Sequence, residues 1–485
     1  MHMRTYQTRF FTDDSLSHAL VRYAKLFSKV EHHLFKAKVL QVDSNTCKRD
    51  FLKRFGITGR QYNAVQVTLK GKIDSIIERR YLQISELEGK IKTLESKVKR
   101  MKNPFTRHQK SRYLKRLKDK LENLQTDRNQ NTVRLCFGSK KLFCAQFALE
   151  ENGFASHEEW KAVWQEKRNS EFFVLGSKDE MSGNQSCTAI LQEDGNLTLR
   201  LRLPDSLGLG RYVTISSINF AYGHQEVITA LLNKQAISYR FKKDARGWRV
   251  FVSTQISTAT LTTKENLGRI GVDINSDRLC LVETDRFGNM VRKETLPLCL
   301  RGKTTHQSKA LIGEASKKVI EIAKAVKKPI ILEKLDFTQK RTSLREKGAS
   351  FARMLSSFAY SSILTHIRSR ADKHGVEVKE VNPAYTSIIG RVKFAKRYGL
   401  SIHHAAAFVI ARRSLKFSEK PPSSIKDIPD GKGGHVALPL PARNRGEHVW
   451  TFWRRFGKKI SAALAAHFQA MKNRSTSSCK AAHAT

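Results

Sequence analysis

The stretch "RIGVDINSDRLCLVETDRFGNMV", residues 269–291, decides the fold of the C-terminal half of the chain. Residues 269–275 and 279–285 have the apolar character of strands, and "DRFGN" predicts a hairpin turn before a third strand at 290–298. Asp273 lies inside the first strand, where a buried carboxylate is costly unless a cation offsets its charge. An isolated G-x-D is usually a structural Asp that caps a turn, so a second carboxylate is needed to indicate function.

The elements that follow this hairpin complete the order of a known fold. Apolar periodicity predicts a helix at 306–326, a buried strand at 328–335 and a long helix at 351–373. A strand at 376–383 and a last helix from about 401 follow. The order β-β-β-α-β-α-β-α is that of the ribonuclease H fold.

Glu333 supplies the second carboxylate. It ends the fourth strand, which in this topology lies beside the first, so we expect it next to Asp273. Two carboxylates at adjacent strand ends can share Mg²⁺, which takes oxygen ligands and keeps waters. With two ions, one activates the attacking water and the other stabilises the leaving oxygen of a phosphodiester. We therefore predict that Asp273 and Glu333 are catalytic metal ligands.

The charge of the chain indicates its partner. The 485 residues include 89 Lys and Arg against 44 Asp and Glu, a formal charge of +45. A surplus of this size is expected to face nucleic acid. A membrane partner is disfavoured because no stretch approaches the roughly 20 apolar residues of a spanning helix, and the start of the chain has no signal-peptide pattern. Seven cysteines without a C-x-x-C pair indicate no disulfide framework and no zinc site.

A basic helical hairpin is predicted near the middle of the N-terminal half. Apolar residues recur at spacings of three and four from 84 to 101 and again from 114 to 124, and "KNPF" at 102–105 separates the two runs. Between Lys97 and Lys120, 11 of 24 residues are Lys or Arg and one is acidic. A solvated helix face is the alternative, but this density favours contact with phosphates. The residues predicted to bind nucleic acid here are Lys97, Lys99, Arg100, Lys102, Arg107, Lys110, Arg112, Lys115 and Arg116.

In residues 131–263 the helical spacing of apolar residues gives way to the alternation of apolar and polar residues that is typical of strands. "NLTLRLRL" at 196–203 places its leucines on one face and Arg200 and Arg202 on the other, so we predict an antiparallel β domain, a small barrel, with a basic face that binds nucleic acid. A purely structural scaffold is the alternative. From about 418 to 445 the chain is rich in Pro, Gly and Ser and is predicted to be a disordered linker. The amphipathic basic helix after it, from about 448, either docks on the protein or stacks on bases.

The motifs resemble a known family. "IGVDIN", "IILEKLDF" and "VNPAYTSIIG" look like the first two RuvC motifs and the connecting segment of TnpB, the transposon-encoded RNA-guided DNA nuclease, and of the type V CRISPR effectors. "FGITGRQYNAV" and "LCFGSKKLF" extend the resemblance over most of residues 1–417. It implies a multidomain α+β protein of a prokaryotic cytoplasm, associated with the nucleoid, that binds a guide RNA and target double-stranded DNA. The expected parts are a wedge-domain start (1–20), a helical recognition domain (21–130), a β-barrel wedge domain (131–265), a RuvC nuclease domain (266–417) and a basic, partly disordered tail (418–485).

Two departures from the family concern the active site. The zinc ribbon expected after "YTS" is absent, because only "IIGRVKFAKRYGL" follows it and carries no cysteine. The usual third motif, D-x-N-A-A, is replaced by "SIHHAAAFVIARR", which has no acidic residue. We expect His403 or His404 to replace the third carboxylate as a metal ligand. Neutral imidazole is a good ligand for Mn²⁺ and a poor one for Mg²⁺. The alternative is a packing helix whose histidines cap its first turn.

Three functions remain open at this point. The first is an RNA-guided endodeoxyribonuclease that uses Mg²⁺ or Mn²⁺ and reads a short flanking motif. The second is a nuclease-dead relative that acts as an RNA-guided DNA-binding repressor. The third is a transposase with a ribonuclease H fold.

Overall fold

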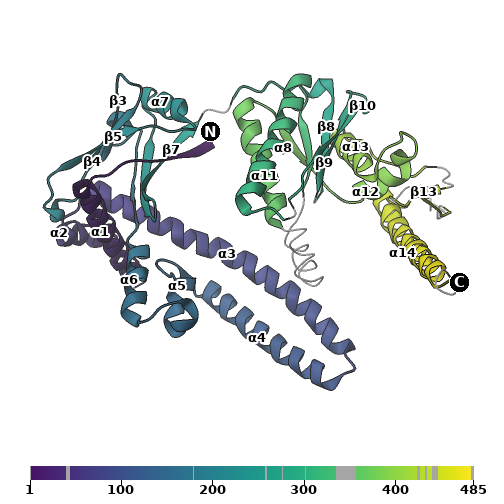
Figure 1. Ribbon diagram of the computed structural model, residues 1–485, viewed down its shortest axis with the longest axis horizontal. Helices are drawn as coiled ribbons and strands as arrows, with labels where there is room; N and C mark the ends of the chain where they lie inside the picture. The colour runs from purple at the N-terminus through teal and green to yellow at the C-terminus, as the bar shows by residue number, and fades with distance from the viewer. Residues whose placement is uncertain are drawn as a thin grey trace. The chain divides into compact units, whose positions relative to one another are not determined.

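The structure is a computed structural model that describes residues 2–39, 44–178, 180–256, 259–275, 277–300, 302–334, 357–422, 427–431, 434–439 and 446–481. The chain divides into two compact units, Met1–Ser257 and Thr258–Thr485 (Figure 1). Among the described helices, none has the length and apolar character needed to cross a membrane.

Two antiparallel sheets form the β part of the first unit, with strand orders β1-β7-β6-β2 and β3-β4-β5. The strands are β1 (His2–Arg9), β2 (Glu171–Val174), β3 (Cys187–Leu191), β4 (Leu197–Arg202), β5 (Tyr212–Ile218), β6 (Ile237–Asp244) and β7 (Gly247–Ile256). The predicted barrel is wrong, because in the described part of the chain no ladder joins the two sheets. Alternating apolar residues specify strands, but they do not specify whether the edge strands β1 and β2 pair with another sheet.

The helices of the first unit share a core with its sheets. They are α1 (Asp14–Val39), α2 (Ser44–Phe55), α3 (Gly59–Arg100), α4 (Pro104–Asn129), α5 (Lys140–Cys144), α6 (His157–Arg168) and α7 (His224–Leu232). Tyr23 of α1 stacks on Phe172 of β2 with 4.2 Å between ring centroids, and Phe172 stacks in turn on Phe241 of β6. The helical segment and the β segment therefore form one packed body.

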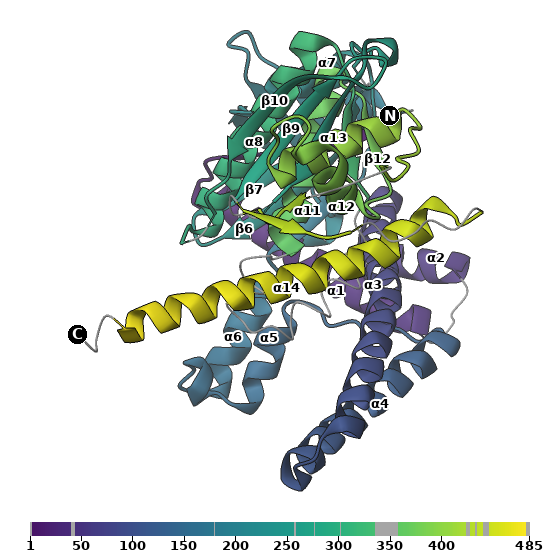
Figure 2. The same cartoon turned by 90° about the vertical axis from the view of Figure 1, so that its right-hand side faces the viewer.

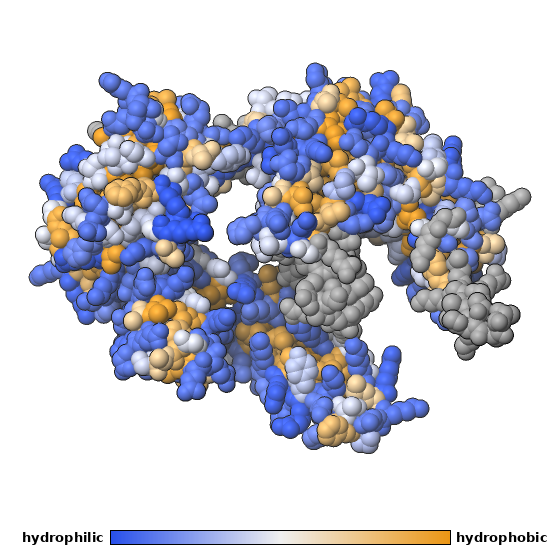
Figure 3. Space-filling model, viewed as in Figure 1, coloured by the Kyte–Doolittle hydropathy of each residue, from blue (hydrophilic) through white to orange (hydrophobic). Residues whose placement is uncertain are grey.

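The helical hairpin α3–α4 confirms the prediction of two paired helices joined at Asn103 and Pro104. Asn103 caps α4, because its side-chain oxygen accepts from the amides of Phe105 and Thr106, and Pro104 occupies the first helical position. An ion pair of 2.7 Å links Lys118 of α4 to Glu95 of α3. Hydrophilic residues cover most of the surface in Figure 3, including the part formed by this hairpin.

The second unit is built on a five-stranded sheet of order β10-β9-β8-β11-β12. β8, β9 and β10 pair antiparallel, and β11 is parallel to both β8 and β12. This is the sheet of the ribonuclease H fold, and the predicted order of strands and helices is confirmed. The elements are β8 (Arg269–Ile274), β9 (Arg278–Thr284), β10 (Met290–Pro297), α8 (Thr305–Val326), β11 (Ile330–Glu333), α11 (Ser357–His374), β12 (Val378–Val381), α12 (Thr386–Ile389) and α13 (Ile402–Ser414).

Helices cover both faces of this sheet. α8 and α11 pack on the face that carries Ile270, Val272 and Ile330. α13 packs on the opposite face, where Val282 joins its buried residues in a separate core. The predicted start of the long helix at 351–356 lies outside the described residues.

The C-terminal tail differs from the prediction. Part of the expected disordered linker forms a two-stranded sheet of β13 (Asp427–Pro429) and β14 (His435–Ala437), in which Ile428 is buried. The helix after it, α14 (Val449–Ala481), is the long yellow helix in Figure 2. It docks on the protein, because Trp453 is fully buried and its indole donates to the carbonyl of Glu419 at 2.8 Å.

Candidate active site

Asp273 lies near the end of β8, the central strand of the second sheet. Its side chain is 12% exposed, and it pairs across the ladder with Cys280 of β9. Oδ2 accepts a hydrogen bond of 2.9 Å from the side-chain amide of Asn275 and lies 3.2 Å from Nδ1 of His403. The carboxylate that interrupts the first strand is therefore held by polar partners at the end of that strand.

Glu333 ends the neighbouring strand β11. Ile330 pairs with Ile270 in parallel register, and continuing this register along both strands sets Glu333 level with Asp273. Residues at the same level of adjacent strands point to the same face, and the strands lie about 4.8 Å apart. Thr386 holds the second carboxylate, because its hydroxyl donates to Glu333 Oε1 at 2.5 Å. The register therefore indicates that the two predicted carboxylates lie at the same level of neighbouring strands, two residues beyond the last recorded pair, Ile331 with Gly271.

The start of α13 lies at this end of the sheet because the helix packs unusually close to β8. A Cβ at position 271 would lie 2.0 Å from the carbonyl oxygen of Ala407 and 2.7 Å from the amide of Ala411, so only glycine fits there. Ser401 caps the helix by accepting from the amide of His404. His403, in the first turn, consequently reaches Asp273. The positive end of the helix dipole also favours anionic oxygens at this position.

His404 points elsewhere. Its Nε2 lies 3.0 Å from the hydroxyl of Thr295 and 3.2 Å from the carbonyl of Glu294, both on β10, and its Nδ1 lies 2.8 Å from the Ser401 hydroxyl. Burial lowers the pKa of His404. Of the two candidate histidines, the geometry brings His403 to Asp273 and uses His404 to attach α13 to the sheet edge.

The two carboxylates lie in an environment that keeps neighbouring acids neutral. Burial raises the pKa of Tyr360 on α11 well above its usual range, and the charges of Glu333 and Asp273 raise it further. Burial, assisted by the charge of Asp273, raises the pKa of Cys280 to about 11. Tyr360 and Cys280 are therefore neutral near pH 7, and neither adds a negative charge at this end of the sheet.

This donor set fits a hard divalent cation. Mg²⁺ is usually held by one or two carboxylates, with waters and substrate phosphates completing its coordination. Within the described residues, no group of three or more His, Cys, Asp or Glu side chains is placed to hold a metal ion. The residues that would hold the ion are thus Asp273 and Glu333, and the remaining positions would be left to water and substrate.

The sequence did not single out several residues of this site. Thr386, which holds Glu333, lies in the "YTS" segment, and Asn275 ends "IGVDIN", so both are inside motifs that carried a signal. Tyr360 lies in α11, whose sequence pattern gave no signal for a functional residue. Asp277 also approaches the site, since Arg278 and, to a lesser extent, His403 lower its pKa.

The residues predicted to bind nucleic acid lie in two places in the first unit. The nine from Lys97 to Arg116 are all exposed, on the C-terminal part of α3, the connection and α4. α4 has no buried residue, so it presents nearly all its side chains to solvent. On β4, the Arg200 guanidinium lies 4.1 Å from the centre of the Tyr212 ring, whereas Arg202 donates to Asp205 at 2.7 Å. Arg200 is exposed and Arg202 is half-buried.

Comparison with known proteins gives similarities to solved structures. No family model and no curated protein matches the sequence. The chain is similar to T. thermophilus RuvC in complex with a Holliday junction substrate, at 17% identity and a TM-score of 0.22, over 30% of this chain and 90% of that chain. It is also similar to the CRISPR-Cas12f ternary complex, at 12% identity and a TM-score of 0.22, over 86% of this chain and 100% of that chain.

Proposed function

We propose that the protein is an RNA-guided DNA endonuclease that hydrolyses phosphodiesters with divalent metal ions held by Asp273 and Glu333. The observation that supports the proposal is the parallel pairing of Ile330 with Ile270 and of Ile331 with Gly271 in a sheet of ribonuclease H order. Continued along both strands, this register puts Glu333 level with Asp273. A packed core alone gives no reason for two adjacent, poorly hydrated carboxylates. Binding of a cation and a phosphate gives a reason for this pair of carboxylates.

Asp273 and Glu333 would hold the divalent ions, whose contribution would be activation of the attacking water and stabilisation of the leaving oxygen of the phosphodiester. The residues of the chain supply position and charge. Thr386 fixes the orientation of Glu333 through its hydroxyl. Asn275 and His403 converge on Oδ2 of Asp273 and fix that carboxylate at the sheet end. The N-terminus of α13 adds a positive dipole near Asp273, which would favour anionic oxygens there.

The guide RNA and the target duplex are proposed partners. The exposed basic surface from Lys97 to Lys120 is suited to a nucleic-acid backbone, because its density of cations releases many counterions on binding. The resemblance of the motifs to TnpB supports RNA guidance, in which base pairing supplies sequence specificity and the protein reads a short flanking motif. Sequencing of RNA that copurifies with the protein tests this part directly.

Separate Asp273→Ala and Glu333→Ala variants test the active site. Each is expected to abolish cleavage of a matched target in Mg²⁺ while guided binding stays near that of the parent, because the substitutions remove metal ligands and leave the phosphate contacts in place. Glu321→Ala on α8 is the control, since its carboxylate is largely exposed and pairs only loosely, at 3.9 Å, with Lys317. Cleavage retained by either active-site variant would refute the two-carboxylate site.

A nuclease-dead RNA-guided DNA-binding protein is the second candidate. It is favoured by the start of α13, where Ile402, His403 and His404 stand in place of an acidic residue. Under this alternative the parent protein binds a guided target and protects it, but leaves it intact in both Mg²⁺ and Mn²⁺. The same cleavage assay therefore separates the two candidates.

A further inference from the structure

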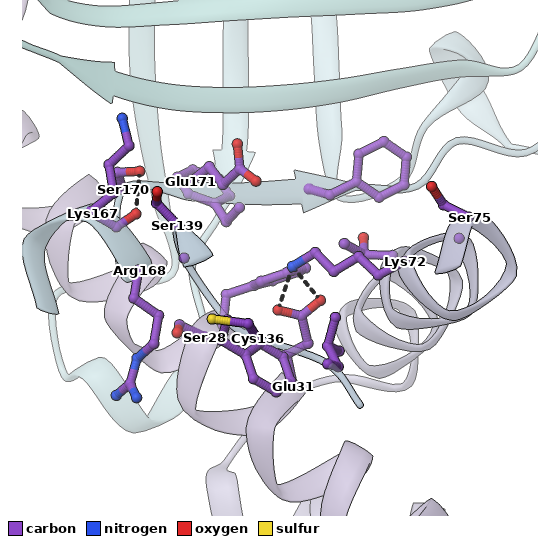
Figure 4. A pocket seen from close by; sticks show the side chains of 18 of the residues that line it. Ser28, Glu31, Lys72, Ser75, Cys136, Ser139, Lys167, Arg168, Ser170 and Glu171 are labelled. Atoms are coloured by element: carbon purple, nitrogen blue, oxygen red, sulfur yellow. Dashed lines mark hydrogen bonds and ion pairs between the residues drawn. The ribbon is translucent and has the colours of Figure 1, made fainter. Parts of the chain in front are cut away.

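A large cavity lies in the first unit, whereas the proposed active site belongs to the second. Its volume is about 870 Å³, and it is lined by α1, α3, β2, β6, the segment 134–140 and the end of α6 (Figure 4). Small-molecule sites in proteins span roughly 300–1,000 Å³. The cavity is therefore large enough for a nucleotide and part of the strand on either side.

The lining of the cavity is strongly basic. Eight cationic side chains face two carboxylates, Glu31 and Glu171. The cations are Lys72, Arg79, Arg134, Lys140, Lys167, Arg168, Arg240 and Lys242. A concave surface with this excess of one sign of charge attracts a polyanion.

Some of these cations are neutralised within the protein and others are not. Lys72 lies 2.7 Å from Glu31, a pair that Figure 4 shows inside the cavity, and Lys242 lies 3.3 Å from Glu171. Four others, which are exposed, have no acidic partner within the described residues: Arg79, Lys140, Lys167 and Arg240. They stand on four different segments around the cavity, where several phosphates could be contacted.

Apolar side chains form another part of the lining. The half-buried side chains of Phe173 on β2, Ile76 on α3 and Leu135 in the connecting segment present this surface, whereas Phe27 and Phe137 line the cavity but are buried. A purely electrostatic groove has no need of this surface. An unpaired base does, because stacking on aromatic and apolar side chains contributes about 1–3 kcal/mol per base without sequence preference.

We propose that this cavity binds one unpaired nucleotide of a nucleic-acid strand, with the base against the apolar lining and its phosphates on the unpartnered cations. The proposal deepens the proposed function, on which it rests for the presence of a bound strand. A paired base cannot enter such a cavity without leaving its duplex. The site is therefore expected to distinguish single strands from blunt duplexes.

Gly71→Phe in the full chain tests the proposal by filling the cavity. Gly71 lies on α3 and lines the cavity, and a Cβ there meets nothing within 4 Å, so a side chain can extend without a clash. Replacement of a mid-helix glycine also favours the helix. Ser85→Phe adds the same side chain at an exposed position farther along α3 and is the matched control.

The probe is a single strand of about 15 nucleotides that contains 2-aminopurine, made once as RNA and once as DNA, and titrated in chelator. Gly71→Phe should bind at least about fivefold more weakly than the parent, the loss expected for one base contact worth about 1 kcal/mol or more, and lose the change in 2-aminopurine fluorescence. Ser85→Phe should bind like the parent, and a blunt duplex should bind equally to all three proteins. The stronger-binding probe identifies the sugar of the strand.

A second measurement needs no substitution. Cys136 lines the cavity, so a bound strand should slow its alkylation more than that of Cys144, which is exposed and does not line it. Unchanged affinity of Gly71→Phe, equal protection of both thiols, or no binding of single strands by the parent would overturn the proposal. Binding is measured without metal, so its result does not depend on cleavage. Nucleotide binding in the cavity can be confirmed for a protein that cuts no DNA, and it can be refuted for a protein that does.

Discussion

Asp273→Asn should separate the functional role of this carboxylate from its effect on stability. The side chain is 12% exposed and lies level with Glu333 on an adjacent parallel strand. At a strand spacing of about 4.8 Å, two unit charges repel each other by about 3 kcal/mol at an effective dielectric constant of about 20. The substitution keeps the shape of the side chain and removes this repulsion.

The expected result in chelator at pH 8, where histidine side chains are ordinarily neutral, is a more stable protein. The amide gives back part of the gain because it accepts hydrogen bonds more weakly than a carboxylate, so we expect about 1–3 kcal/mol. For a unit of the size of Thr258–Thr485, 1 kcal/mol corresponds to about 2–4 °C in Tm. The unfolding transition of this unit should therefore rise by several degrees.

Added Mg²⁺ should reverse the comparison. The parent should gain stability with metal concentration, because an ion that binds only the folded state shifts the unfolding equilibrium by mass action. Asp273→Asn should gain little and should not cut DNA. Glu333→Gln should behave in the same way, whereas Glu321→Gln, which alters a loose and exposed ion pair of 3.9 Å, should leave both Tm values unchanged.

The reasoning fails if Asp273→Asn lowers Tm in chelator, since the carboxylate would then be a stabilising part of the folded structure. It also fails if Mg²⁺ stabilises the parent and the variant equally. Differential scanning calorimetry of the full chain, with and without metal, measures both quantities on one sample.

Three further predictions follow from the geometry. Gly271→Ala should lower the free energy of unfolding, measured with denaturant, by about 1–3 kcal/mol and impair cutting, because its Cβ would lie 2.0 Å from the backbone of α13. Gly313→Ala is the control and should be tolerated, because the nearest atom to its Cβ would lie at 3.8 Å. His403→Ala should reduce cleavage more than His404→Ala in both Mg²⁺ and Mn²⁺, since only His403 contacts Asp273, and equal rates for both variants and the parent would exclude a role for either histidine. Replacing four basic residues between 97 and 120 by Gln should flatten the dependence of nucleic-acid affinity on salt, and an unchanged slope would make this segment a solvated helix face.

Part of the fold could be read from local periodicity. The hairpin α3–α4 and the order of elements from β8 to α13 follow from apolar spacing, capping residues and turn residues, all of which act over a few positions of the chain. The barrel could not be read in this way, because pairing between edge strands is set by contacts between residues far apart in the sequence. The linker prediction for residues 418–445 is wrong in part for a related reason: the composition is that of a linker, but Ile428 is buried in a core supplied by other segments.

The candidate site divides in the same manner. The sequence by itself determined that Asp273 interrupts a buried strand, that Glu333 ends another, and that the last helix begins with histidines instead of an acid. Only the tertiary structure decided that His403, and not His404, reaches Asp273, and that Thr386 holds Glu333. The physical reason is that strand period fixes which residues share a face, whereas the approach of α13 depends on Gly271, which allows two backbones distant in sequence to meet.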